Sequence, residues 1–340
     1  MKSIAIILTN VGTPESPSLK DVRKYLSEFL NDKYVINLPF ILRRLLVNGI
    51  IVPFRSRKSS KLYQKLWTEK GSPLLYYSKK LQEKLQNKLP EYKVFLGMRY
   101  GNPSLKAVLE NVKNNHYQKV LVLPLYPQYA SSTTKSVIDI VQKESKTWKH
   151  IPELKIIEQF YNHPKFVNAF VEQIKTFEYK RYDHIIFSYH GLPLSHITNI
   201  HPNIKHETCS CENELPEHGK YCYKATCYET TRLLIKELQI PEEKYSVGFQ
   251  SRLTKRWLSP FTDELILKLL NQGKKRILVV APSFVADCLE TNIEIEKEYK
   301  DLFLASGGKE LTLVKSLNDS DLWVNALYEM LTPNDYNPKN

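Results

Sequence analysis

One histidine occupies a position from which a side chain can do chemistry. His190 follows the apolar run Ile185–Phe187 and precedes Gly191 and Pro193, which must turn the chain. This pattern predicts an imidazole at the carboxyl end of a buried strand. Because the unperturbed pKa of histidine is about 6.5, the ring can accept a proton or bind a metal near neutral pH. A hydrogen-bonded histidine with a purely structural role is the alternative.

A row of acidic residues follows another apolar run. After Ile277–Ala281, carboxylates recur at a spacing that an α-helix would place along one stripe, at Asp287, Glu290, Glu294 and Glu298. Oxygen ligands one turn apart suit transient binding of a divalent cation, and the same row could relay protons. The alternative is a solvated helix face whose first acids favour the helix N-terminus.

Four of the five cysteines are crowded into one segment, at Cys209, Cys211, Cys222 and Cys227. In a cytoplasmic chain of this length, such close thiols indicate a metal site more readily than a disulfide framework. Their spacing matches neither the usual zinc knuckle nor the plant-type ferredoxin pattern. Free or redox-paired thiols are the alternative.

Length and composition are those of an ordinary folded protein. The chain has 340 residues, which predicts two domains, and 42% of its residues are hydrophobic. The net charge of +13 would attract nucleic acid, anionic lipid or an anionic small molecule, but no basic arm or nucleic-acid motif occurs. We find neither a signal peptide nor an apolar stretch of the roughly 20 residues that a spanning helix needs. We therefore expect a cytoplasmic protein that does not bind nucleic acid and that could rest on the inner face of a membrane.

Short apolar runs alternate with longer amphipathic segments along the chain. The predicted strands are Ile4–Leu8, Val94–Met98, Val120–Leu125, Leu154–Ile157, His184–Ser188, Tyr245–Phe249, Ile277–Ala281 and Leu311–Val314. The clearest predicted helices are Pro73–Lys88, Leu105–Lys113, Lys165–Thr176 and Asp263–Leu270. Near-continuous apolar strands separated by helices are typical of buried parallel sheets, so an α/β fold is expected.

An internal similarity indicates two related halves. Three segments of the first half have counterparts in the same order in the second: Asn10–Pro14 with Tyr189–Pro193, Leu96–Arg99 with Val247–Gln250, and Val120–Leu123 (with Thr133 and Thr134 downstream) with Ile277–Val280 (with Thr291). Each segment lies at the carboxyl end of a predicted strand, where open α/β sheets bind their ligands. A cleft between two such halves is the expected site.

Several motifs together resemble the ferrochelatase family. They are Phe187–Pro193, Phe249–Arg252 with Trp257, Pro282–Glu294, Leu8–Pro14, Gly71–Pro73, Met98–Tyr100, and Tyr126–Tyr129 followed by Ser132–Thr134. The resemblance implies two Rossmann-like domains with parallel sheets flanked by helices and a porphyrin cleft between them. It also implies a lyase that inserts Fe²⁺ into a porphyrin during haem biosynthesis. We place the domains at residues 1–160 and 161–325, followed by a C-terminal tail at 326–340.

The resemblance also assigns roles to individual residues. It implies a catalytic His190 and Glu290, both meeting the incoming Fe²⁺, with a further helix carboxylate at Glu294. The residues expected to hold the macrocycle and its carboxylates are Val11, Arg57, Ser72, Arg99, Tyr100, Trp257 and Phe284. In this chemistry the imidazole takes pyrrole N–H protons, carboxylates carry them to water, and arginines bind the porphyrin carboxylates.

Two positions depart from the family pattern. Cys288 stands where many relatives have a second histidine, and a small buried residue is the expected role. Val11 stands where some relatives have a tyrosine that can contact the metal, which favours protoporphyrin IX over coproporphyrin III as the substrate.

Some alternatives remain open at this point. Certain ferrochelatases carry a 2Fe–2S cluster, so the resemblance favours such a cluster at the four crowded cysteines, with zinc as the alternative. A chelatase for another tetrapyrrole, such as sirohydrochlorin, is a second enzyme hypothesis. A porphyrin or haem carrier without catalytic activity is a third, although a carrier would not need both His190 and the acidic row.

Overall fold

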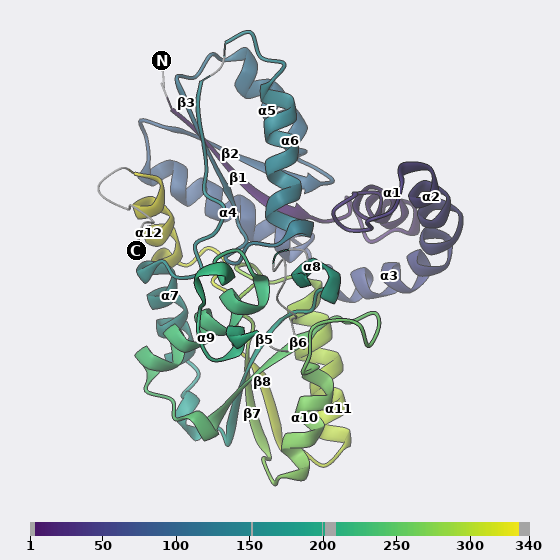
Figure 1. Cartoon of the computed structure of the whole chain (residues 1–340), viewed down its shortest axis with the longest axis vertical. Helices are drawn as coiled ribbons and strands as arrows, with labels where there is room; N and C mark the ends of the chain where they lie inside the picture. Colours follow the sequence, from purple (N-terminus) through teal and green to yellow (C-terminus); the bar gives the residue numbers. More distant parts are fainter. Residues whose placement is uncertain (1–3, 151, 199, 201–208, 333–340) are drawn as a thin grey trace. The chain divides into compact units, whose positions relative to one another are not determined.

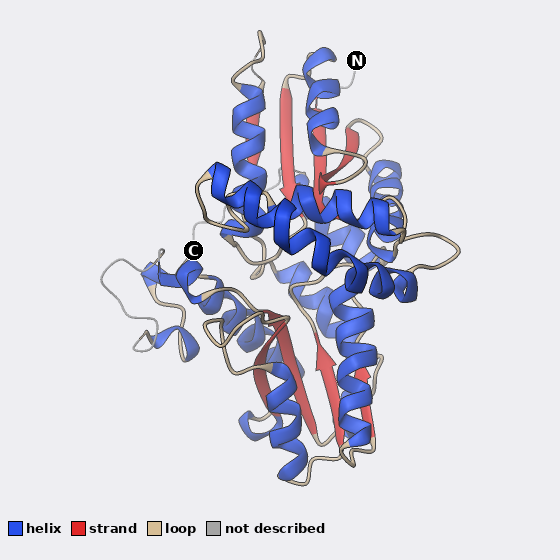
Figure 2. Cartoon of the chain, turned by 90° about the vertical axis from the view of Figure 1, so that its right-hand side faces the viewer, coloured by secondary structure: helices blue, strands red, loops and turns tan. Residues whose placement is uncertain are grey.

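The computed structural model of the chain describes residues 4–150, 152–198, 200 and 209–332 (Figure 1). These residues form two compact units. The first unit takes its residues from 1–126, 131–159 and 318–340, and the second from 127–130 and 160–317. Each unit contains one parallel sheet of four strands with helices beside it (Figure 2).

The sheet of the first unit has the strand order β2-β1-β3-β4. Its strands are β1 (Ile4–Gly12), β2 (Lys93–Tyr100), β3 (Lys119–Pro124) and β4 (Glu153–Ile156). The helical segments are α1 (Leu19–Leu30), α2 (Phe40–Leu46), the π-helix η1 (Val47–Ile51), α3 (Val52–Leu66), α4 (Pro73–Lys88), α5 (Leu105–Asn114), the π-helix η2 (Ser131–Lys135), α6 (Ser136–Ser145) and α12 (Asp321–Leu331).

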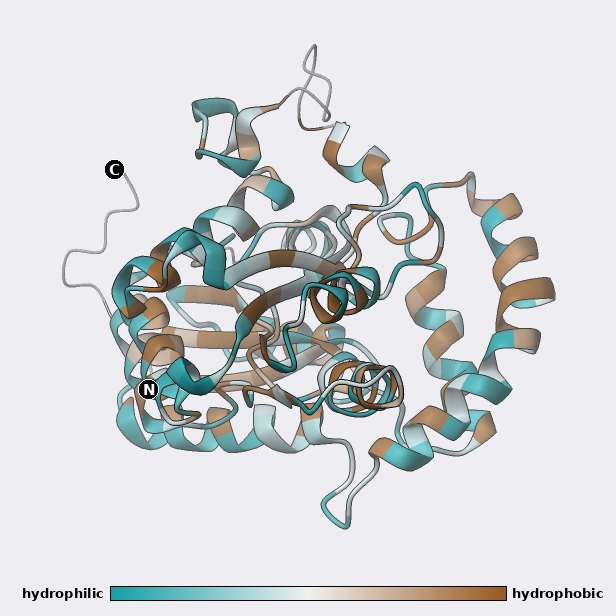
Figure 3. Cartoon of the chain, turned by 90° about the horizontal axis from the view of Figure 1, so that it is seen from below, coloured by the Kyte–Doolittle hydropathy of each residue, from teal (hydrophilic) through white to brown (hydrophobic). Residues whose placement is uncertain are grey.

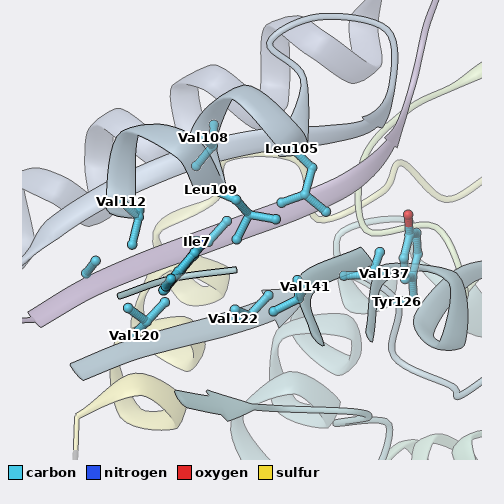
Figure 4. Packing of buried hydrophobic residues seen from close by; sticks show 12 residues of the cluster. Ile7, Leu105, Val108, Leu109, Val112, Val120, Val122, Tyr126, Val137 and Val141 are labelled. Carbon is cyan, nitrogen blue, oxygen red and sulfur yellow. The ribbon is translucent and has the colours of Figure 1, made fainter. Parts of the chain in front are cut away.

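The central strands of this sheet are apolar on both faces because helices cover both. Ala5 to Leu8 of β1 are completely buried. On one face, Ile7, Val120 and Val122 pack in a cluster that includes Leu109 of α5 and Val141 of α6 (Figure 4). Packing of this kind fixes the carboxyl ends of β1 and β3, where candidate site residues begin.

The C-terminal helix differs from the domain division expected from the sequence. We placed residues 161–325 in the second domain and 326–340 in a tail, but α12 lies in the first unit. It packs on α4, buries Trp323 and Leu327 completely, and places Asp321 in an ion pair with Lys84. The apolar face of α12 needs a partner, and α4 provides it.

The sheet of the second unit has the order β6-β5-β7-β8. Its strands are β5 (His184–His190), β6 (Tyr245–Gln250), β7 (Arg276–Val280) and β8 (Glu310–Leu313). The α- and π-helices are α7 (Pro164–Lys175), α8 (Leu194–Thr198), α9 (Tyr223–Leu238), α10 (Thr262–Asn271), the π-helix η7 (Glu290–Tyr299) and α11 (Lys300–Ala305). Short 3-10 turns are η3 (Tyr179–Arg181), η4 (Ser210–Glu212), η5 (Glu217–Gly219) and η6 (Glu242–Lys244).

The two sheets repeat one topology, which confirms the internal similarity seen in the sequence. In each sheet the first strand along the chain pairs with the second and third, and the fourth pairs with the third. Gly97 of β2 and Gly248 of β6 occupy equivalent places, where a Cβ atom would lie 2.9 Å from Leu105 Cα and 2.9 Å from Thr262 Oγ1, respectively. Both glycines therefore let the following helix approach its strand closely.

The predicted elements agree well with the structure. Each predicted strand overlaps an observed one, and the helix predicted over Pro73–Lys88 has those bounds. Among the described residues, no helix has both the length and the apolar character needed to cross a bilayer.

Candidate active site

His190 is the last residue of β5 and is half-buried. Its Nδ1 atom lies 2.6 Å from the carbonyl oxygen of Gly191. Because a carbonyl oxygen can only accept a hydrogen bond, Nδ1 carries the proton in the neutral ring. The lone pair therefore resides on Nε2, which is the atom able to accept a proton or bind a metal.

Two aromatic rings flank this imidazole. The ring centroids of Trp257 and Phe284 lie 6.4 Å and 6.3 Å from that of His190, and both rings are tilted against it. Gly191 permits the approach, because a Cβ atom there would lie 2.8 Å from the Gln250 carbonyl oxygen and 3.4 Å from the Trp257 ring. The structure thus brings three predicted site residues together within the second unit.

The loop that carries Phe284 is held by polar contacts on its other side. The Ser283 hydroxyl donates to Gln128 Oε1 at 3.0 Å and lies 3.2 Å from the Tyr223 hydroxyl of α9. The amide nitrogen of Gln128 in turn donates to Thr230 at 2.9 Å. These bonds fix the position of the Phe284 ring beside His190.

The carboxylate of Glu294 is surrounded by hydrogen-bond donors. Oε1 accepts from the Ser251 N–H at 2.7 Å and from the Tyr299 hydroxyl at 2.6 Å. Oε2 accepts from the Ser251 hydroxyl and from Gln250 Nε2, the latter at 3.3 Å. Burial, followed by the negative charge of Glu294, raises the pKa of Tyr299, so this phenol stays a donor. Such a set of donors fixes the orientation of the carboxylate.

Gln250 connects the histidine strand to the acidic helix. It pairs with His190 in the register of β5 and β6, and it is almost fully buried. Its amide nitrogen donates to the Glu290 carbonyl oxygen at 2.9 Å, while its Oε1 accepts from the Ser188 hydroxyl at 2.8 Å. We did not include Gln250 among the site residues predicted from the sequence, although its place at a strand end beside the histidine strand was a usable signal.

The acidic row differs from the expected α-helical stripe. Residues Glu290–Tyr299 form a π-helix, whose hydrogen bonds close on the fifth residue instead of the fourth. Asp287 precedes this helix, is buried, and accepts a hydrogen bond from the Ser316 N–H at 3.0 Å. The prediction that Asp287 belongs to the stripe was therefore wrong, because its carboxylate satisfies a backbone group instead. Glu290 and Glu294 are half-buried, and Glu298 is exposed.

Cys288 lies just before this helix and is buried. Burial raises the pKa of its thiol strongly, and the nearby carboxylate of Glu290, to which the thiol donates a hydrogen bond, raises it further. The side chain therefore stays a neutral thiol at physiological pH. This agrees with the small buried residue expected from the sequence, and it adds a contact to Glu290.

The predicted residues of the first unit lie in several environments. Val11 is half-buried near the end of β1, and Arg57 is exposed on α3. Ser72 precedes α4 as its N-cap residue and is buried, yet its hydroxyl has no hydrogen-bond partner among the described residues. A buried hydroxyl without a partner is costly, so Ser72 is well suited to bond a ligand.

Arg99 and Tyr100, at the end of β2, share one buried carboxylate. Arg99 Nη2 lies 2.5 Å from Asp32 Oδ2, and the Tyr100 hydroxyl donates to the same oxygen at 2.8 Å. Tyr100 is almost fully buried, and burial, its largest influence, raises the pKa of its phenol. The Tyr100 hydroxyl is thus engaged within the protein. Sequence reasoning missed Asp32, which lies far from β2 along the chain.

The cysteine segment gathers part of the predicted set. Cys209 Sγ lies 3.6 Å from His218 Nε2, and the ligand atoms of Cys209, Cys211 and His218 all lie within 4.8 Å of one another. A hydrogen bond from Cys211 lowers the pKa of Cys222 and raises that of Cys211. Cys227 is fully buried on α9, and burial raises the pKa of its thiol, which interacts with Tyr223. His218 was not predicted, because nothing in its local sequence marks it.

Comparison with known proteins assigns the chain to a family. The family model of ferrochelatase matches residues 3–334. The chain is 43% identical to the ferrochelatase of Legionella pneumophila strain Paris over 329 residues, covering 96% of this chain and 98% of that protein. It is 39% identical to the ferrochelatase of Pseudomonas fluorescens strain SBW25, with 96% and 97% covered. The chain therefore belongs to the ferrochelatase family, the metal chelatases of haem biosynthesis.

Solved structures agree with the fold class. The chain resembles SirB from Bacillus subtilis with Fe³⁺, with a TM-score of 0.53 and 11% sequence identity, over 96% of this chain and 93% of that one. At this identity the likeness concerns the fold alone. Together with the two four-stranded parallel sheets, it confirms the expected pair of Rossmann-like halves.

Proposed function

We propose that this chain inserts Fe²⁺ into protoporphyrin IX, with His190 as the base. The observation that carries the proposal is the contact between His190 Nδ1 and the Gly191 carbonyl oxygen, which leaves Nε2 of the neutral ring as the proton acceptor, with two aromatic rings close to the imidazole. A neutral imidazole in an apolar setting suits removal of protons from a flat, hydrophobic molecule.

The reaction exchanges two protons for one metal ion. Both pyrrole N–H groups of the porphyrin lose their protons, and Fe²⁺ takes their place on the four ring nitrogens. In this proposal His190 Nε2 accepts the protons one after the other, and Glu290 and Glu294 carry them towards water. Glu294 is held by four donors, and the Glu290 main chain is bonded to Gln250 beside His190.

Trp257 and Phe284 serve as walls for the macrocycle. Their tilted rings beside the imidazole offer an apolar surface against which a porphyrin can bend and expose its nitrogens. Such distortion is offset by binding elsewhere on the molecule. In the first unit, Val11, Arg57, Ser72 and Arg99 remain the proposed contacts to the ring and its carboxylates. Tyr100 is almost fully buried, so its proposed role is indirect, through its hydrogen bond to Asp32.

One assay tests this function against its rivals. Purified protein is mixed anaerobically with protoporphyrin IX and Fe²⁺ or Zn²⁺, and the porphyrin absorption spectrum is followed. We expect catalytic turnover. Binding without turnover would support a carrier. Faster insertion into coproporphyrin III, which has more carboxylates, would identify that porphyrin as the substrate. Activity confined to sirohydrochlorin would support the other chelatase hypothesis.

We propose that the cysteine segment holds a metal group, a 2Fe–2S cluster with zinc as the alternative. Cys209, Cys211 and Cys222 fit as ligands, and His218 is better placed as the fourth than Cys227, which lies against Tyr223. When bound, the metal group would link the ligand residues of this segment to one another. Metal insertion itself needs no electron transfer. Visible absorption and metal analysis test the ligands, with loss of metal expected in Cys209→Ser and retention in Cys227→Ser. The reverse result would restore Cys227 as a ligand.

We further propose a cytoplasmic protein that contacts the inner face of a membrane through α2, η1 and α3. Six large apolar residues are exposed there, forming what we call the apolar patch: Phe40, Ile41, Leu42, Leu45, Ile50 and Phe54. These helices lie at the right of Figure 1, and brown hydrophobic positions mark the same edge in Figure 3. The same helices also carry exposed basic residues, among them Arg44, Arg55 and Lys58, which suits an anionic lipid surface.

Vesicle co-sedimentation tests this surface. Wild-type protein should bind vesicles that contain anionic lipid, and Ile41→Ser combined with Phe54→Ser should lose that binding. Leu322→Ser, which replaces an exposed apolar residue of α12, is the matched control. Equal binding by both variants would contradict the proposal.

A further inference from the structure

A buried carboxylate determines how one of the proposed substrate-binding arginines is held. Asp32 lies after α1, and its relative exposure is 8%. Its Oδ2 atom accepts hydrogen bonds from Arg99 Nη2 at 2.5 Å, from the Tyr100 hydroxyl at 2.8 Å and from the Ser136 hydroxyl at 2.5 Å. Its Oδ1 accepts from the Tyr34 N–H at 2.8 Å. Both oxygens are therefore engaged, and Arg99 is the cation among their donors.

The Arg99 guanidinium is fixed from two sides. Besides the ion pair with Asp32, its Nε–H donates to the Ser136 hydroxyl at 2.7 Å. Its Cζ atom also lies 4.6 Å from the centroid of the Tyr100 ring. A guanidinium carries five N–H groups, so these contacts leave the Nη1 pair and one Nη2–H for a further acceptor. The side chain retains 17% exposure, so part of it remains accessible.

Three separate elements meet at this carboxylate. Asp32 follows α1, Arg99 and Tyr100 end β2, and Ser136 begins α6. Because all three elements lie in the first unit, the hydrogen bonds around Asp32 depend on the geometry of that unit alone. The planar guanidinium recognises a carboxylate well only when its edge is correctly aimed, and an unrestrained arginine would lose rotamer freedom on binding.

We propose that Asp32 is a positioning residue for substrate recognition: it aims the free edge of Arg99 at a carboxylate of the porphyrin. Asp32 itself touches no substrate and acts through Arg99, with Ser136 as the bridge between them. The inference rests on the proposed function, because it takes a porphyrin carboxylate as the acceptor. It also gives the buried Asp32 a role beside Arg99. Without Asp32, the charge of Arg99 would attract anions but would not orient them.

The test compares an acid with its ester. Dissociation constants of metal-free protoporphyrin IX and of its dimethyl ester are measured by fluorescence quenching on the full chain, and their ratio reports recognition of the carboxylates. We expect Asp32→Asn and Arg99→Gln each to lower the ester-to-acid ratio about tenfold, the size of one charge-assisted hydrogen bond. The double variant should lower it no further, because Asp32 acts through Arg99.

Asp139→Asn is the matched control. Asp139 accepts from Lys33 and Tyr34, the two residues after Asp32, at 3.4 Å and 3.2 Å, so its loss disturbs the same turn without touching Arg99. Its ratio should equal that of the wild type. A purely structural role for Asp32 would weaken binding of acid and ester alike, leave the ratio unchanged and overturn the proposal.

Two further outcomes are decisive. If Asp32→Asn does not fold, Ser136→Ala removes the bridging hydroxyl instead and should lower the ratio about threefold; an unchanged ratio there overturns the proposal. A wild-type protein that binds protoporphyrin IX and its ester equally would also overturn it while leaving metal insertion intact. Failure of the wild type to bind either porphyrin would instead remove the proposed function itself.

Discussion

Replacing His190 by alanine tests the centre of the proposed mechanism. The substitution removes Nε2, the one ring nitrogen left without a proton in the neutral ring, so the porphyrin loses its base. A positioned general base contributes about 10²- to 10⁴-fold to a rate. We therefore expect kcat for metal insertion to fall by at least about 100-fold, which corresponds to about 2.7 kcal/mol of activation free energy.

The same change has a smaller cost in stability. The ring contributes contacts to Trp257 and Phe284, each worth about 0.5–1.5 kcal/mol, and one hydrogen bond of about 1 kcal/mol to Gly191. The free energy of unfolding should therefore fall by about 2–4 kcal/mol. Because the proposed function assigns porphyrin binding mainly to the aromatic walls and the carboxylate contacts, the dissociation constant of the porphyrin should change much less than kcat.

Stopped-flow absorption with protoporphyrin IX and Zn²⁺ measures kcat, and fluorescence quenching measures binding. His150→Ala, at an exposed histidine of the first unit, is the control and should keep wild-type activity. Added imidazole should restore part of the activity of His190→Ala, since the deleted ring leaves space between Trp257 and Phe284. Full kcat in His190→Ala, with the protein folded, would refute the assignment of the base.

Three further outcomes follow from the second unit. Tyr299→Phe removes a 2.6 Å donor to Glu294, so the free energy of unfolding measured in urea should fall by about 1.5–3 kcal/mol; no change would show that the bond contributes nothing. Gly191→Ala places a Cβ atom 2.8 Å from the Gln250 carbonyl oxygen, so melting temperature and activity should both fall, and an unchanged melting temperature would contradict the close packing. Burial lowers the pKa of His184 to about 4, below its unfolded value, so the unfolded chain binds the extra proton first. Stability should therefore be constant above about pH 6.5 and fall by up to about 3 kcal/mol towards pH 4, a slope that disappears in His184→Leu.

The strands and the position of His190 were predictable because both depend on local patterns. Buried parallel strands need near-continuous apolar runs, and Ile185–Phe187 followed by a turn is such a run. The end of that run then fixes where the next side chain stands. Gly97 and Gly248 also reflect local structure, because the helix that follows each strand packs so closely that it leaves no room for a side chain.

The remaining parts of the site depend on contacts between segments far apart in the sequence. Asp32 meets Arg99 across the first unit, and no local pattern marks a carboxylate for that role. Asp287 matched a helical spacing, but the helix begins later and winds as a π-helix. A period of 3.6 residues cannot reveal such a change in winding, which is set by the packing of side chains around it.

Helix α12 follows the second unit in the sequence but packs in the first. This arrangement affects when the first unit can complete its core and where the chain can be truncated. A ribosome must release the entire second unit before the helix that buries Trp323 becomes available to α4. The core of the first unit is therefore completed only after the second unit has been synthesised. Deleting residues 318–332 should expose apolar surface on α4, so a shortened chain would be prone to aggregation even with every residue of the second unit present.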